Sequence, residues 1–300
     1  MRVIRPHTYT IESSNVPEDD APAYNAGTTY ALGAQVIYQH NVYESAQAEN
    51  TGNTPGLSPD WWFLVGATNQ RKMFDIYLNT RTEYLELIDV KLGVQRTDFI
   101  SLFGLEGNTV NIKLWNDAET ELLWEREIDL VYGTSTVEIS DWYEYFFGEY
   151  SFKEDVSTSI GVITFSGVLQ ITITAATGTN AACGNFVLGR QHNIGKTQYG
   201  ATVGFLDYSR KSANEFGQIF LKQGNFAKVN SYSIIVENLN VDPVFRLLAS
   251  LRGTATAWVG DDRDESGFES LLVYGFFRDF SIVIGNPTIS ECRLEIEGIA

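Results

Sequence analysis

Apolar and polar residues alternate strictly in Val110-Asn-Ile-Lys-Leu114 and again in Leu169-Gln-Ile-Thr-Ile173. Because successive side chains of a β-strand point to opposite faces of a sheet, this period of two indicates strands with one buried face. Weaker alternation occurs in Leu122–Ile128 and in Val137–Ile139, and Gly, Asn and Asp residues separate the runs. We therefore predict an antiparallel, jelly-roll-like β-sandwich over residues 67–187.

The last third of the chain, residues 188–300, continues the strand pattern and interrupts it once. Runs typical of strands are Ser231–Val236, Ala255–Val259, Leu271–Tyr274, Phe280–Ile284 and Arg293–Ile296. After the first of them, Asp242 stands at an N-cap position, Pro243 in a first helical turn and Gly253 just past a segment with helical apolar spacing. The protein is thus predicted to be mainly β, with a C-terminal β domain that carries one helix at about 242–252.

The first 23 residues show neither a helical nor an alternating period. They contain Pro6, Pro17 and Pro22 and the acidic run Glu18–Asp20. Such a composition predicts an extended arm over residues 1–23. An arm of this kind either reaches a neighbouring subunit or lies along its own domain, and the sequence leaves both open.

Aromatic residues and glycines recur at short intervals in residues 24–66, which we interpret as a small β module. Alternation in Ala34–Tyr38 and Asn41–Ser45, with the polar pair Gln39–His40 between them, predicts a hairpin. The segment Glu49–Asp60 is rich in Asn, Gly, Thr, Ser and Pro and predicts a long loop that leads to Trp61-Trp62.

Exposed aromatic rings in this module are candidates for sugar binding. A flat ring offers an apolar face to the C–H face of a pyranose. The candidates are Trp61 and Trp62, followed by Tyr30 and Tyr43. A module of this size must also fill its own core, so we expect one tryptophan inside and one outside.

Charge and cysteine content exclude several classes of protein. With 21 Lys+Arg against 38 Asp+Glu, the net charge of the 300-residue chain is −17, which disfavours nucleic acid and anionic lipid as partners. Cys183 and Cys292 are too few to staple the fold by disulfides. No run of about 18 apolar residues occurs, and the N-terminus has no export signal, so we predict no membrane insertion.

Motifs for catalysis and for cofactors are incomplete. Gly195-Lys-Thr197 lacks the first glycine of a phosphate-binding loop, and Asp262–Gly267 lacks the later glutamate of a calcium loop. His7, His40 and His192 show no zinc spacing. We predict no catalytic residue, no metal and no cofactor. Paired carboxylates of a glycosidase stay open, because two acids about 5–10 Å apart need no sequence motif.

The aromatic module carries a first resemblance. The pattern consists of Tyr30-Ala-Leu-Gly33-Ala-Gln-Val36, Tyr43, Gly52, Pro55 and Trp61 or Trp62. It resembles the small chitin-binding module of carbohydrate-binding families five and twelve, although the loop is long and no catalytic domain follows. The resemblance implies glycan contact through exposed aromatic rings. Copies of this module in phage tail proteins also serve as structural decoration.

A second resemblance covers more of the chain. Its N-terminal segments are Met1–Pro6, Ser14–Asp20, Tyr24–Gly66 and Thr68–Asp75. Its C-terminal segments are Tyr199-Gly200, Val203–Phe205, Asp207–Lys211, Phe216-Gly217, Asn240–Asp242, Tyr274–Phe276, Asp279–Ser281 and Cys292–Gly298. Together they resemble distal tail or baseplate proteins of long-tailed bacteriophages.

The second resemblance implies a part of a virion, made in the host cytoplasm and located in the phage tail, rather than an enzyme. We expect a symmetric ring of identical subunits that docks on other tail proteins and binds glycans of the host surface during adsorption. Two alternatives stay open, namely purely structural tail decoration without glycan binding and a polysaccharide-degrading enzyme.

Overall fold

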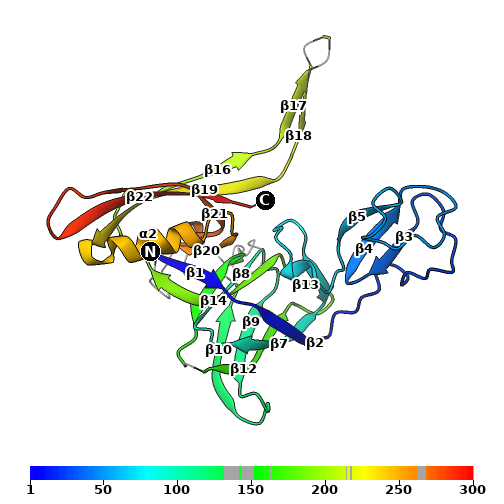
Figure 1. Ribbon diagram of the computed structural model, residues 1–300, viewed down its shortest axis with the longest axis horizontal. Helices are drawn as coiled ribbons and strands as arrows, with labels where there is room; N and C mark the ends of the chain where they lie inside the picture. Colours follow the sequence, from blue (N-terminus) through cyan, green and yellow to red (C-terminus); the bar gives the residue numbers. More distant parts are fainter. Residues whose placement is uncertain are drawn as a thin grey trace.

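The computed structural model describes residues 1–131, 142, 152–162, 164–213, 215–216, 218–261 and 268–299. Within them the chain is mainly β, as predicted, and its curled antiparallel sheets form a sandwich-like half-barrel. Figure 1 shows this body with the small N-terminal module on one side and a long hairpin projecting from it. The predicted strand at Val137–Ile139 and the Asp262–Gly267 segment lie outside the described residues.

One layer of the sandwich is a five-stranded sheet. In spatial order its strands are β10 (Leu122–Asp129), β9 (Thr109–Trp115), β12 (Ser166–Thr174), β7 (Leu87–Gln95) and β2 (Tyr9–Ser14). Buried and partly exposed residues alternate along β9, and Leu114 lies opposite Leu169 of β12. The two stretches with strict alternation are thus neighbouring strands, and their apolar residues form one face of the core.

The described residues also contain a ten-stranded antiparallel sheet. Its strands are β11 (Val156–Ser159), β8 (Phe99–Phe103), β14 (Asn185–Asn193), β1 (Arg2–Pro6), β20 (Thr256–Val259), β21 (Leu272–Val283), β22 (Ile289–Gly298), β19 (Phe226–Glu237), β15 (Lys196–Thr197) and β16 (Thr202–Asp207). Both β15 and β16 pair with β19. The order brings strands from the start, the middle and the end of the chain side by side.

Smaller elements complete the fold. Two-stranded pairs are formed by β6 (Thr82–Leu85) with β13 (Asn180–Cys183) and by β17 (Arg210–Ala213) with β18 (Ile219–Lys222). The aromatic module contains β3 (Gln35–Tyr38), β4 (Asn41–Ser45) and β5 (Trp62–Ala67). Short 3₁₀ turns are η1 (Lys72–Phe74), η2 (Asn238–Asn240) and η3 (Glu269–Leu271).

The large sheet contributes to three core clusters, and two of them pack it against other elements. Ile100 and Leu102 of β8 pack with Ile112 and Ile171 of the five-stranded sheet, which closes the sandwich. At its other end the sheet carries α2 (Val241–Ser250), whose apolar face packs on β19, β21 and β22. Burial of these faces from water is the main stabilising term of both cores.

The predicted helix at 242–252 is confirmed as α2, with small differences at its ends. Asp242 lies in the first turn, where its charge favours the helix dipole, and Asn240 occupies the N-cap position without a side-chain cap bond. Gly253 has a φ of +66°, so it adopts the left-handed conformation that ends many helices. The predicted strands Leu271–Tyr274 and Phe280–Ile284 belong to one strand, β21, which has an irregularity between Phe277 and Asp279.

The N-terminal arm lies on its own domain. Residues 2–6 form β1 between β14 and β20, and residues 9–14 form β2 on the edge of the five-stranded sheet. The sequence left open whether the arm reaches a neighbouring subunit or lies along its own domain, and these residues lie along their own domain. The proposed division at 187/188 falls inside β14, which belongs to the sheet shared by both parts, and the division into domains stays a prediction.

Candidate functional site

The aromatic module is a three-stranded antiparallel sheet in the order β3-β4-β5. The predicted hairpin is present, with Gln39 and His40 as its turn. Both turn residues have a positive φ, at 49° and 62°, which matches the turn geometry that follows the twist of a two-residue hairpin. In Figure 1 the module lies apart from the half-barrel, connected to it by two chain segments.

Trp62 forms the core of this module. Its side chain is 3% exposed, and its indole N–H donates a hydrogen bond of 2.8 Å to the carbonyl oxygen of Asn53. The ring centroids of Tyr24 and Tyr30 lie 5.9 and 5.3 Å from the indole, in edge-on geometry. Trp62 therefore does not present a surface platform, because the module has few aliphatic residues and fills its interior with this ring.

The other three predicted platform residues are partly exposed. Tyr30 packs on Trp62, and its hydroxyl accepts a hydrogen bond of 2.7 Å from the amide of Asn25. The hydroxyl of Tyr43 lies 3.3 Å from the position that a Cβ of Gly56 would occupy, so this ring packs against the long loop. Trp61 lies before the first residue of β5, partly exposed. The expected pattern of one inner and one outer tryptophan thus assigns Trp62 to the core and Trp61 to the surface.

Three apolar residues on β5 were not predicted as surface residues. Phe63, Leu64 and Val65 follow Trp62 directly, and each exposes more than half of its side chain on an edge strand. The available sequence signal was a run of consecutive apolar residues without alternation. Such a run is typical of a strand buried on both faces, so the signal pointed away from exposure.

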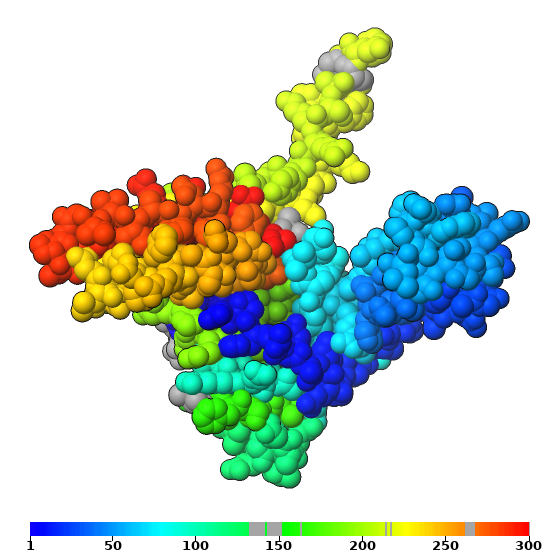
Figure 2. All heavy atoms as spheres, in the orientation of Figure 1, coloured from blue at the N-terminus to red at the C-terminus, as the bar shows by residue number. Residues whose placement is uncertain are grey.

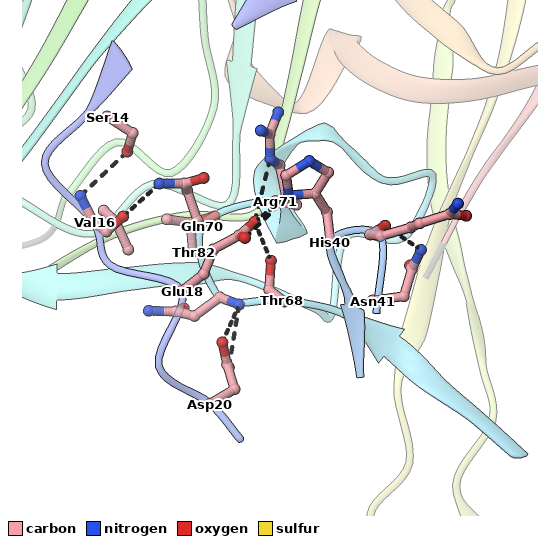
Figure 3. A network of polar contacts seen from close by, with 12 residues as sticks. Ser14, Val16, Glu18, Asp20, His40, Asn41, Thr68, Gln70, Arg71 and Thr82 are labelled. Atoms are coloured by element: carbon pink, nitrogen blue, oxygen red, sulfur yellow. Dashed lines mark hydrogen bonds and ion pairs between the residues drawn. The ribbon is translucent and has the colours of Figure 1, made fainter. Parts of the chain in front are cut away.

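Glu18 connects the module to the arm (Figure 3). Its carboxylate lies 2.7 Å from His40 Nδ1 and 3.5 Å from Arg71 Nε, and it accepts a hydrogen bond of 3.0 Å from the Thr68 hydroxyl. Burial raises the pKa of Glu18, but the hydrogen bonds from His40 and Thr68 and the nearby charges outweigh burial and lower the pKa overall. The charged carboxylate of Glu18 therefore links the hairpin turn at His40 to the two chain segments that connect the module to the half-barrel.

The second candidate surface is the projecting hairpin, which we define as residues 202–226. At its base β16 pairs with β19, and farther out β17 pairs with β18, with Arg210 opposite Lys222. Every residue of β17 and β18 is exposed. Figures 1 and 2 show the hairpin extending away from the half-barrel and touching no other described part of the chain along its outer half.

Large apolar side chains cover this hairpin. The exposed ones are Val203, Phe205, Leu206, Tyr208, Phe216, Ile219, Phe220, Leu221 and Phe226. Sequence reasoning missed β16, β17 and β18, because a hairpin without a core has no buried face to impose a period of two. A concentration of exposed apolar groups on one projecting element is typical of a protein interface.

A cavity of about 380 Å³ lies at the base of the projecting hairpin. Phe103 and Tyr274 contribute apolar wall, and Asp155 and Lys228 contribute an ion pair of 2.6 Å. Asp155 also accepts a hydrogen bond of 3.1 Å from the amide of Gly104. Glu154 lines the same cavity, so two carboxylates lie beside one hollow here, which is the arrangement that the enzymatic alternative requires.

The two thiols are buried in cores. Cys183 belongs to the sandwich core, where burial raises its pKa to about 12. Cys292 packs under α2, and burial raises its pKa to about 11. Thiols with such pKa values are protonated at neutral pH and are poor nucleophiles. Both cysteines act as core side chains.

Comparisons with known proteins give no family assignment. No protein-family model matches the chain, and no curated protein is significantly similar to it. None of the described helices combines the length and the apolar character needed to cross a lipid bilayer.

Proposed function

We propose that this protein is a structural subunit of the tail tip or baseplate of a long-tailed bacteriophage, and that it assembles into a symmetric ring. The observation that carries the assembly part is the projecting hairpin with its uncovered apolar side chains. The virion part of the proposal rests on the resemblance of the N-terminal and C-terminal segments to distal tail proteins.

An isolated two-stranded hairpin is only marginally stable in water. Among the described strands, β17 and β18 pair with each other alone, and β18 exposes Phe220 and Leu221 next to each other. Covering these side chains by a partner would remove apolar surface from water and fix the hairpin. A hairpin that docks on a different surface of the next copy makes a head-to-tail contact, and such contacts form a ring when the rotation between successive copies closes.

Replacing Phe220 and Leu221 together by serine is expected to raise the concentration needed for assembly roughly 100-fold. Two buried apolar side chains are worth about 3 kcal/mol, and each 1.4 kcal/mol corresponds to a factor of about ten. Sedimentation velocity over a range of protein concentrations measures the change.

The control is the double variant Leu32→Ser/Leu57→Ser, which removes two equally exposed apolar side chains from the aromatic module. It is expected to assemble like the unmodified protein. A chain that stays monomeric at high concentration, or hairpin and control variants that assemble equally well, would contradict the proposal.

Glycan contact is the second candidate function, favoured by the partial exposure of Trp61 and of Tyr43 in the same module. We expect the assembled protein to bind bacterial surface glycans on an array and Trp61→Ala to weaken this binding at least tenfold. Phe63→Ala is the matched control, since Phe63 lies two residues after Trp61 and also has an exposed ring. Equal binding by both variants would exclude Trp61 as the platform, absence of binding on the array would favour structural decoration, and release of reducing ends from the same glycans would favour the enzyme.

A further inference from the structure

Four basic residues meet where β1 pairs with β14. Arg5 lies directly opposite Arg190, and His192 lies two residues farther along β14, opposite Val3. Because residues opposite each other or two apart on a strand share one face, both guanidinium groups and the His192 ring are on the same side of the sheet. His7 follows β1 directly and donates its amide to the carbonyl oxygen of Leu188. We call Arg5, His7, Arg190 and His192 the basic cluster.

The basic cluster is unexpected in a chain with a net charge of −17. Like charges directly opposite each other in an antiparallel pair are destabilising. Within the described part of the chain, neither Arg5 nor Arg190 forms an ion pair that would offset this cost. Stability of the fold therefore does not account for two adjacent arginines at this position.

Two side-chain nitrogens of the cluster lack a hydrogen-bond partner. Nε of Arg190 and Nε2 of His7 are buried and have no hydrogen-bond partner among the described residues. A buried donor without a partner costs free energy that an incoming acceptor would recover. An oxygen ligand beside the guanidinium pair would supply an acceptor for Arg190 Nε, and for His7 Nε2 when that nitrogen carries the proton.

The nearby carboxylate of Asp98 does not serve as the acceptor for these two nitrogens. Asp98 accepts a hydrogen bond of 2.7 Å from the amide of Gln191, so it is held at the backbone of β14. Burial lowers the pKa of His192, and the positive charges of Arg190, Arg5 and His7 lower it further, while Asp98 opposes them. The positive charges around His192 thus exceed the compensation from Asp98.

We propose that the basic cluster binds a tetrahedral oxyanion, a sulfate or phosphate group. The planar guanidinium group presents paired N–H donors that match such an ion, and two of them side by side balance its double charge. Nε of Arg190 and Nε2 of His7 supply further donors on the same side. This site is separate from the projecting hairpin and from the aromatic rings, and it does not depend on the proposed function.

Binding is expected to strengthen as the pH falls from 7.5 to 5.5. A protonated His192 adds positive charge to the site and so increases the affinity for an anion. Because the pKa of His192 is lowered, this increase comes at a pH below the usual histidine pKa of about 6.5. The groups that face His192 are Arg5, His7, Arg190 and Asp98, and of these the two arginines keep their charge throughout this range. Sulfate suits the measurement, because it stays doubly charged over the whole interval.

The test is a calorimetric titration of the full chain with sodium sulfate, with sodium chloride at matched ionic strength as the reference. We expect binding of sulfate beyond the chloride effect and a several-fold gain in affinity between pH 7.5 and 5.5. Arg190→Gln should weaken the affinity at least tenfold. Arg246→Gln, which removes an equal charge from the exposed face of α2, should leave it unchanged.

A second measurement separates loss of binding from loss of folding. Without sulfate, Arg190→Gln should keep or raise the thermal midpoint, because it removes a repulsion between opposed charges. Titrations with inorganic phosphate and with glucose 6-phosphate are then compared. Equal binding of the two would indicate a site for a free ion, and tighter binding of the sugar phosphate would indicate a site for a phosphoryl group on a larger ligand. Sulfate binding no stronger than that of chloride, or equal affinities of Arg190→Gln and Arg246→Gln, would overturn the proposal.

Discussion

Replacing Trp62 by alanine is expected to lower the free energy of unfolding of the aromatic module by about 3–5 kcal/mol. The indole is 3% exposed and packs edge-on against Tyr24 and Tyr30. Alanine would leave a cavity between these rings and would also leave the carbonyl oxygen of Asn53 without its donor. A module with only three described strands has no second core to compensate for this loss.

Chemical denaturation of Trp62→Ala and Phe63→Ala, followed by circular dichroism in the near ultraviolet, provides the measurement. Phe63 is the adjacent residue of β5 and is 62% exposed, so its removal should change stability by no more than about 0.5 kcal/mol. Equal effects of the two substitutions would show that Trp62 is not the core residue. A decrease in glycan binding by Trp62→Ala would then be a consequence of unfolding rather than of a lost platform.

The two tryptophans illustrate what sequence could predict about the candidate site. Neighbouring residues of an extended chain point to opposite sides, so one inner and one outer ring was predictable for Trp61-Trp62. Which ring lies inside depends on the position of Tyr24 and Tyr30, and these come from a segment more than thirty residues away. A contact of that sequence separation leaves no trace in the local pattern.

The fold was predictable where burial is one-sided. Strands such as β9 and β12 bury one face, and their alternation gave the sandwich. By contrast, β1 is buried through its place between β14 and β20, and Arg2–Pro6 has no period of its own. The basic cluster could not be predicted from the sequence either. Its two arginines lie 185 positions apart and meet only through the pairing of β1 with β14.

The base of the projecting hairpin supplies the second large expected effect, a loss of about 3 kcal/mol of stability in Lys228→Met at pH 7. Lys228 of β19 forms an ion pair of 2.6 Å with Asp155, whose side chain is 11% exposed against 30% for the lysine. Removing the ammonium group leaves a largely buried carboxylate with the Gly104 amide as its remaining described donor. A charge left buried without its counter-ion costs more than the pair itself contributes.

The pH dependence of this effect follows from the carboxyl group. Burial raises the pKa of Asp155, the Lys228 charge and the hydrogen bonds from Lys228 and Gly104 lower it in part, and Glu269 raises it again. A carboxyl group whose folded pKa lies above its unfolded pKa contributes stability at low pH and loses that contribution as the pH rises through the folded pKa. Methionine removes the main opposing charge, so the loss in Lys228→Met should be largest at neutral pH and should shrink as Asp155 takes up a proton.

A double-variant cycle tests whether the charge left behind, rather than lost packing, causes the effect. Asp155→Asn in the Lys228→Met background keeps an acceptor for the Gly104 amide and removes the buried charge, so most of the lost stability should return. Lys222→Met on the exposed strand β18 is the control and should change stability by no more than about 0.5 kcal/mol.

A double variant as unstable as Lys228→Met alone would assign the loss to packing of the lysine stem. Recovery in the double variant would instead assign the loss to the unpaired charge of Asp155, which precedes β11 and lies beside β19 at the base of the projecting hairpin. In that case Lys228→Met should also weaken the proposed ring assembly, because the hairpin would keep its apolar residues but lose its fixed direction.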